Sequence, residues 1–143
     1  MVAGYSKKSL VEKLGIKPGF KLAIIQPIPG YDNLLGALPD DVQKLPGLSS
    51  PLDGIQLDFI QFFTTQRQEL EAEFPRLKSA LAPAGMLWIS WPKGASKIAT
   101  DLNENVVREI GLHNGLVDVK VIAVDDDWSG LKFVYRLADR AYR

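Results

Sequence analysis

The sequence predicts an α/β fold in which helices cover both faces of a mostly parallel sheet, giving three layers. Short, strongly apolar runs alternate with amphipathic segments, and this order implies right-handed crossovers between parallel strands. The run Lys21–Gln26 is apolar nearly throughout, as expected for a strand that is covered on both faces. Two further runs near the C-terminus are separated only by Asp125–Gly130, a gap short enough to predict an antiparallel hairpin.

The N-terminal part of the chain begins with a helix signal. Ser9 and Glu12 have the S-x-x-E spacing of a capping box and Gly15 supplies a stop, so we expect a short helix at about Leu10–Leu14. The elements expected next are a strand at Lys21–Gln26, a short helix at Tyr31–Leu38 and, within the loop-like residues 39–54, one short strand near Val42–Leu45.

The middle of the chain predicts a buried strand followed by a helix. Leu57–Phe63 is aromatic and β-branched, which is typical of a strand, and Thr65 with Gln68 repeats the capping-box spacing. One apolar stripe at helical spacing then comprises Leu70, Phe74, Leu77 and Leu81. Pro75 lies inside this stripe and should kink the helix or divide it, because proline lacks the backbone N–H and crowds the preceding turn.

The rest of the chain alternates in the same way. Pro83 and Gly85 should end the helix before Met86–Trp91, the third strong strand, which Pro92 stops. The next helix should open at the capping spacing of Asp101 and Glu104 and close at Asn114-Gly115. Its apolar face comprises Val106, Val107 and Ile110. Two strands follow, at Val117–Val124 and Leu131–Leu137. We expect one domain over residues 1–143, with an N-terminal helix and turn (1–19), an α/β core (20–137) and a tail (138–143).

Composition excludes several classes of function. The 143 residues hold 17 basic and 17 acidic side chains, one His and no Cys, so disulfides, thiolate metal sites and multi-histidine cages are ruled out. Zero net charge argues against a nucleic-acid partner, since domains that bind nucleic acid usually carry a basic excess. The charges alternate in bands along the chain, which favours alternating solvated faces and also allows complementary patches for self-association or for a charged partner.

Nothing in the sequence suggests a membrane. The first residues contain no apolar stretch fit for a signal peptide. The longest charge-free apolar segment, Leu22–Tyr31, is too short to span a bilayer and contains two prolines. Together with the lack of cysteine, this predicts a cytoplasmic protein.

Several segments carry a resemblance to known proteins. They are Ala3–Ser6, Leu14–Gly19, Leu81–Trp88, Trp91–Lys93 followed by Ala95-Ser96, and Trp128–Val134. On these residues the chain resembles an uncharacterised bacterial family known as domain of unknown function 3052. The second half of the element order also resembles the end of a class I methyltransferase, where a terminal hairpin inserts its last strand antiparallel. The resemblance implies a truncated, Rossmann-like methyltransferase core and a bacterial source, but it brings no established activity.

The turn after the first strand is poorly suited to a cofactor. S-adenosylmethionine and dinucleotide sites need a glycine-rich turn whose N–H groups face the ligand. Here Gln26–Tyr31 has one glycine and two prolines, each of which deletes a donor. No acid that would hold a ribose can be identified after the second strand: Asp53 lies at a plausible distance, but in a stretch of Pro, Ser and Gly that looks like loop. Phe63–Thr65 also lacks the Asn/Asp-Pro-Pro-aromatic motif of amino-group methyltransferases. We therefore expect a degenerate fold with no cofactor.

No catalytic or metal-binding set is visible. His113 is the only candidate general base near neutral pH, and its place before Asn114-Gly115 favours a structural role at a helix C-terminus. Ser90 and Ser96 have no visible base partner. Asp125–Asp127 lacks the spacing of a calcium loop and is more typical of a solvated hairpin loop.

Parallel α/β sheets bind ligands at the carboxyl ends of their strands. The residues expected at or near this crevice are Gln26, Tyr31, Thr65, Arg67, Trp91, Lys93, Ser96 and Trp128. Trp91, Lys93 and Arg67 should converge there, with an anion, Asp101 or Glu69 near the two cations. Such a polar and aromatic set suits small anionic or planar ligands. Trp128, expected in the hairpin loop, should pack down as a lid or line a pocket.

The leading hypothesis is a non-catalytic binding or regulatory domain on a degenerate methyltransferase-like fold, whose partner is a protein or a small anionic ligand. The first alternative is a divergent enzyme, either methyltransferase-like or acting on a small anionic substrate at the strand ends. The second alternative is a homo-oligomeric structural protein, joined through its exposed sheet edge or its charge bands.

Overall fold

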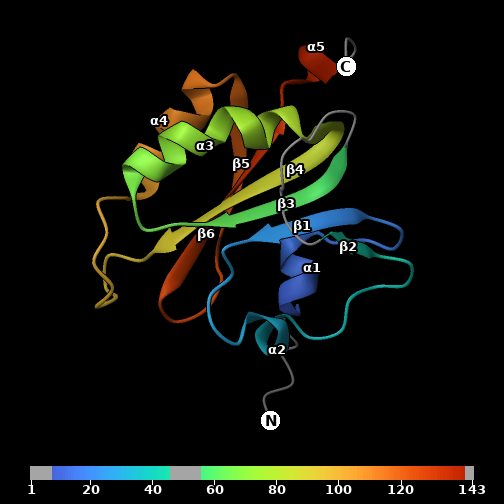
Figure 1. The fold of residues 1–143 in the computed structure, drawn as a ribbon, viewed down its shortest axis with the longest axis horizontal. Helices are drawn as coiled ribbons and strands as arrows, with labels where there is room; N and C mark the ends of the chain where they lie inside the picture. The colour runs from blue at the N-terminus through green and yellow to red at the C-terminus, as the bar shows by residue number, and fades with distance from the viewer. Residues whose placement is uncertain (1–7, 46–55, 141–143) are drawn as a thin grey trace.

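The computed structural model describes residues 8–45 and 56–140, which form one sheet flanked by helices (Figure 1). The strands are β1 (Lys21–Ile25), β2 (Gln43–Leu45), β3 (Leu57–Phe63), β4 (Leu81–Pro92), β5 (Leu116–Ala123) and β6 (Trp128–Tyr135). The helices are α1 (Leu10–Leu14), α2 (Tyr31–Leu35), α3 (Arg67–Ser79), α4 (Glu104–His113) and α5 (Leu137–Arg140).

The strand order is β2-β1-β3-β4-β6-β5. Strands β1 to β4 run parallel to their neighbours, whereas β6 lies antiparallel between β4 and β5. The predicted fold class, a three-layer α/β sandwich with a C-terminal antiparallel hairpin, is therefore confirmed. Asp53 of the predicted loop lies outside the described residues.

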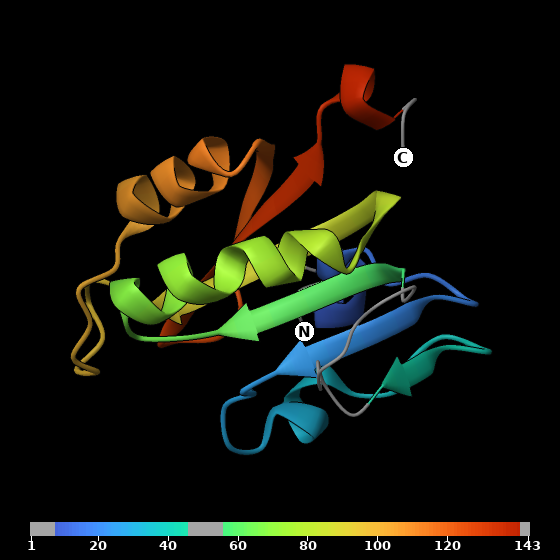
Figure 2. The ribbon, with the colours of Figure 1, turned by 45° about the horizontal axis from the view of Figure 1, so that its top comes forward.

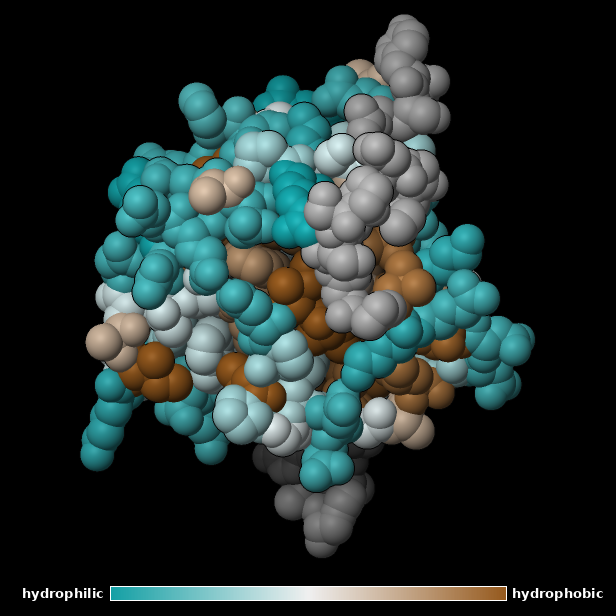
Figure 3. Space-filling view, in the orientation of Figure 1, coloured by the Kyte–Doolittle hydropathy of each residue, from teal (hydrophilic) through white to brown (hydrophobic). Residues whose placement is uncertain are grey.

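Helices cover the two faces of the sheet unequally. Figures 1 and 2 show α3 and α4 on one face and α1 and α2 on the other. Alternate residues of each strand divide between the two cores, so that Ala23 of β1 packs under the first pair of helices while Leu22 and Ile24 pack against the second. In Figure 3, apolar atoms reach the surface near the centre of the view, below the place of α3 and α4 in Figure 1.

Helix α1 matches its sequence signal. The Ser9 hydroxyl accepts a hydrogen bond from the Glu12 N–H at 3.2 Å, and the Glu12 carboxylate accepts one from the Ser9 N–H at 2.9 Å. Gly15 ends the helix in the left-handed conformation, with φ 86°. The Trp88 indole then donates to the Leu14 carbonyl at 2.9 Å and fastens the helix to the middle of the sheet.

The second and third predicted capping boxes are wrong. Helix α3 begins at Arg67 after Gln66, which makes no side-chain cap, because the Asp101 carboxylate accepts the hydrogen bond from the Arg67 N–H at 2.7 Å. Asp101 is therefore not the cap of α4, a position held by Asn103, whose side chain accepts from the Val106 N–H at 2.9 Å. The three-residue spacing of a capping box predicts the cap only where no other part of the chain supplies the acceptor for the first N–H groups of the helix.

The region from Pro75 to Gly85 also departs from expectation. Helix α3 continues through Pro75, which lies on the exposed side where water can bond the carbonyl left without its N–H partner. Leu81 begins β4 instead of ending the helical stripe, and Pro83 and Gly85 lie inside this strand. Extra residues bulge there, since the register jumps from Leu57 opposite Leu81 to Phe59 opposite Met86.

Two shorter predictions need smaller corrections. Helix α2 stops at Leu35, three residues early, because Gly36 takes φ 80°. Trp128 is not a loop residue: it opens β6 and is 9% exposed. The hairpin turn is correspondingly tight, and the Asp125 carboxylate accepts hydrogen bonds from the N–H groups of Asp127 and Trp128, each at 2.8 Å.

No helix within residues 8–45 and 56–140 combines the length and apolar character needed to cross a bilayer.

Candidate functional site at the strand ends

The carboxyl ends of β1 and β3 mark the topological switch point of the sheet. From β1 the chain crosses to β2 on one side, and from β3 it crosses to β4 on the other. Open α/β sheets bind their ligands in the crevice at this point. The residues that follow these two strands therefore decide whether the crevice is available.

Gln26 lies across the switch point. Its backbone takes φ 56°, a left-handed conformation that is unusual for residues other than glycine and asparagine. From this position its amide donates to the Phe63 carbonyl at 2.8 Å and to the Glu69 carboxylate at 3.2 Å, joining the end of β1 to the end of β3 and to α3. The buried Thr64 hydroxyl donates to the same Glu69 oxygen. We call Gln26, Thr64 and Glu69 the polar bridge.

A buried hydrogen-bond chain lies deeper in the sheet. The Tyr31 hydroxyl donates to the Gln61 side-chain oxygen at 2.6 Å, and the Gln61 amide donates to the Ser90 hydroxyl at 3.1 Å. Gln61 and Ser90 are fully buried and Tyr31 nearly so. Burial raises the pKa of Tyr31 well above its usual range, although the bond to Gln61 opposes this, so the phenol stays neutral. This chain is a structural network: among the described residues, no buried side-chain nitrogen or oxygen lacks a hydrogen-bond partner.

The aromatic residues predicted to line the crevice belong to the core. The Tyr31 ring meets Phe63 edge to face at 4.9 Å, and Phe63 meets Trp128 in the same manner at 5.5 Å. Trp91 is 4% exposed and packs in the core beneath α3 and α4. Trp128 therefore packs down, which was one of the two roles expected for it, whereas Trp91 lies in the core and not in the crevice. Tyr31 is also buried, although it forms part of the wall of a surface hollow that follows β1.

The predicted cation pair is not held as expected either. The Arg67 guanidinium bonds Glu71 of its own helix at 3.1 Å, while Asp101 meets the Arg67 backbone and not its side chain. Around Lys93 the chain forms a local turn, in which the Ser96 N–H donates to the Lys93 carbonyl at 3.0 Å. Thr65 uses its carbonyl to accept from the Thr100 hydroxyl at 2.7 Å.

Two hollows lie at the surface of the described residues. One, of about 450 Å³, follows β1 and is lined by Pro27, Ile28, Gly30, Tyr31, Asp32 and Asn33. Two of its lining residues offer no backbone donor to a ligand, since Pro27 has no N–H and the Tyr31 N–H bonds the Ile28 carbonyl at 3.1 Å. The other, of about 590 Å³, runs between α3 and α4 and is lined by Arg67, Glu71, Pro75, Glu109, Ile110, His113 and Asn114. Much of the surface over these helices is hydrophilic in Figure 3.

His113 is placed as its sequence context predicts. It is the last residue of α4, exposed to solvent, and it lines the α3/α4 groove. In the part of the chain that the structure describes, no three His, Asp or Glu side chains gather closely enough to hold a metal ion.

Sequence reasoning placed Gln26 and Tyr31 at the strand ends but missed the hydrogen bonds that form the polar bridge and the buried chain. The available signal was the presence of polar residues inside apolar runs: Gln61 within β3 and Ser90 within β4. A polar residue in such a run must find a buried partner, and adjacent parallel strands are the nearest source of one. That Gln26 would span the switch point could not be read from its neighbours in sequence.

Comparison with solved structures finds methyltransferases. The chain is similar to a SAM-dependent methyltransferase from Aquifex aeolicus, with a TM-score of 0.61 and 16% identity over 87% of this chain and 86% of that one. It is similar to a TehB-like SAM-dependent methyltransferase from Corynebacterium glutamicum, with a TM-score of 0.55 and 12% identity over 94% and 91% of the two chains.

A third similar structure contains a ligand. It is the magnesium protoporphyrin IX methyltransferase of Synechocystis with bound SAH, with a TM-score of 0.56 and 13% identity over 89% of this chain and 78% of that one. No protein-family model and no curated protein gives a match. At such low identity the likeness establishes the fold alone. This chain has a methyltransferase-like fold.

Proposed function

We propose that this protein is a binding domain on the methyltransferase fold and that it does not transfer methyl groups. The observation that carries the proposal is the polar bridge, in which Gln26 lies where a ligand of this fold would enter. A cofactor would have to break the two hydrogen bonds of Gln26. Each such bond contributes about 0.5–1.5 kcal/mol, and somewhat more when the acceptor is charged.

The turn after β1 gives the ligand little in return. Its prolines supply no N–H, and Gly30 precedes a helix of a single turn, α2. A cofactor carboxylate held at this position would therefore find fewer backbone donors than a glycine-rich turn offers. Loss of a hydrogen-bond network combined with few new bonds predicts weak binding or none.

A divergent methyltransferase is the second candidate. The similar structures favour it, and taken alone they support it better than they support a binding domain. On this alternative, Gln26 swings away and the hollow beside Pro27 and Gly30 receives the cofactor. The resemblance to domain of unknown function 3052 stays a proposal that favours neither candidate.

Calorimetry with S-adenosylmethionine and S-adenosylhomocysteine separates the two candidates. We expect no dissociation constant below about 100 μM, which corresponds to roughly 5.5 kcal/mol of binding. Gln26→Gly should be measured beside the wild type, because it removes the bridge and also relieves the left-handed backbone. Gain of binding in this variant alone would show that the bridge is what excludes the cofactor. Tighter binding by the wild type, or transfer of a labelled methyl group, would overturn the proposal.

A further inference from the structure

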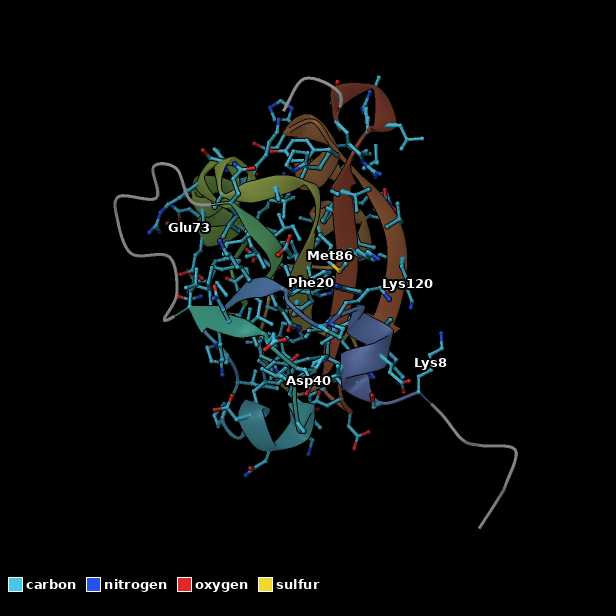
Figure 4. All side chains as sticks on the ribbon, turned by 90° about the vertical axis from the view of Figure 1, so that its right-hand side faces the viewer. Lys8, Phe20, Asp40, Glu73, Met86 and Lys120 are labelled. Atoms are coloured by element: carbon cyan, nitrogen blue, oxygen red, sulfur yellow. The ribbon has the colours of Figure 1, made fainter. Side chains whose placement is uncertain are left out.

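Two lysines face each other across the terminal hairpin. Lys120 of β5 lies directly opposite Lys132 of β6. Lys132 is also in register with Trp88 of β4, on the side of the sheet where α1 packs. The Lys120 ammonium donates to the Lys13 carbonyl of α1 at 3.2 Å, and Figure 4 shows Lys120 on the side of the molecule that carries this helix. Lys17 follows α1, and we call Lys17, Lys120 and Lys132 the lysine cluster.

The arrangement places two positive charges opposite each other on neighbouring strands. Like charges directly opposite on antiparallel strands destabilise a sheet. Lys132 is half-buried, and no residue in 8–45 or 56–140 forms an ion pair or hydrogen bond with its ammonium. Burial lowers the pKa of Lys132, and the neighbouring charges of Lys120 and Lys17 lower it further.

An ordinary structural role explains only part of the cluster. Lysines and bulges on edge strands prevent edge-to-edge association, and β5 has both, with a register shift between Asp118 and Lys120. Lys120 also complements the negative end of the α1 dipole. Neither explanation applies to Lys132, which is on an interior strand and makes no such contact.

We propose that the lysine cluster binds the phosphoryl group of a small ligand. Lys120 and Lys132 lie opposite each other on adjacent strands, and Lys17 is near enough for its charge to act on Lys132. Such a group suits a single multiply charged anion better than an extended one. Ammonium groups act as compact point charges toward phosphate, without the planar geometry that a guanidinium imposes. A bound dianion would neutralise the repulsion between Lys120 and Lys132. This site is independent of the strand ends, so it stands whether or not they bind a cofactor.

Titration with inorganic pyrophosphate at low ionic strength tests the site. We expect saturable binding by the wild type and a loss of about tenfold or more in affinity for Lys132→Gln and for Lys120→Gln. Lys97→Gln is the matched control, because it removes the same charge from an exposed loop after β4. Amide NMR shifts should locate the bound anion on β5, β6 and the α1–β1 loop.

Two further probes distinguish other occupants. Equal affinity of Lys132→Gln and Lys97→Gln for pyrophosphate would overturn the proposal, as would the absence of binding at about 1 mM pyrophosphate. Binding of a single-stranded oligonucleotide or of polyglutamate through the same lysines, without binding of pyrophosphate, would assign the surface to a macromolecular partner and would also overturn it. Thermal denaturation of Lys132→Gln provides a second readout, with stability expected to rise as the repulsion is removed.

Discussion

The Asp101 carboxylate caps helix α3 by accepting the backbone N–H of Arg67 at 2.7 Å, from 34 positions along the chain. Because this acceptor comes from the loop before α4, it couples the start of one helix to the approach of the next. Asp101→Ala should lower the free energy of unfolding by about 1 kcal/mol, the usual value of an N-cap. Asp101→Asn should lower the free energy of unfolding by only about 0.3 kcal/mol, because asparagine is nearly as good an N-cap. Urea denaturation measures both values. If Thr65→Ala lowers the free energy of unfolding as much as Asp101→Ala does, Asp101 is not the residue that caps α3.

Tyr31→Phe removes the hydroxyl that bonds the buried Gln61 oxygen. We expect a loss of about 1–3 kcal/mol near neutral pH, because the Gln61 acceptor is left without this donor. The mutation should also change the response to alkali.

The folded state raises the pKa of Tyr31, so the stability that this phenol contributes is complete below its unfolded pKa of about 10 and is lost as pH rises beyond it. Between about pH 8 and pH 10.5, the urea midpoint of unfolding should therefore decrease more in the wild type than in Tyr31→Phe. Equal falls in the two proteins would mean that the phenol is not protected from ionisation.

Gly111→Ala tests the close approach of α4 to the sheet. A methyl group at this position would lie 2.0 Å from the Phe133 ring, which is itself held edge to face against Phe74 at 5.6 Å. Alanine favours the helix by roughly 1 kcal/mol over glycine, but overpacking here should outweigh it and give a net loss of about 1–3 kcal/mol. Gly94→Ala is the control, because nothing lies near its added methyl group. Its free energy of unfolding should be within about 0.5 kcal/mol of the wild-type value.

His113→Gln should be almost silent. The side chain is exposed at the end of α4, so we expect a change of less than about 0.5 kcal/mol in unfolding free energy near pH 7.5. A loss above about 1.5 kcal/mol would show that His113 makes an essential contact.

The strands and the first helix were predictable because their signals are local, although the starts of β4 and β6 were not. Leu57–Phe63 is apolar enough to be a buried strand in any α/β context, and Ser9 with Glu12 forms its box from neighbouring residues. The caps of α3 and α4 were not predictable in this way, since Asp101 could serve either helix and only the packing of the two decides between them.

The candidate site was harder to predict than the fold. Trp91 was assigned to a crevice because it ends a strand, but its position in the alternation of β4 directs it into the core with Leu87 and Ile89. Conversely, Lys132 and Lys120 were not singled out, because the sequence predicts the hairpin without giving the register that sets the two lysines opposite each other. Sites made by strand pairing are invisible until the register is known.

The position of β6 has a consequence for the order of folding. It is the final strand in sequence, yet it occupies an interior place between β4 and β5. During synthesis, β4 therefore keeps an unpaired edge until Trp128–Tyr135 has left the ribosome. Until then β5 also lacks β6, the strand with which it pairs. Such non-local pairing is slow and leaves an edge open to aggregation. Completion of the sheet thus depends on its last strand, and a nascent chain that stalls before Trp128 would present β4 to chaperones or to other chains.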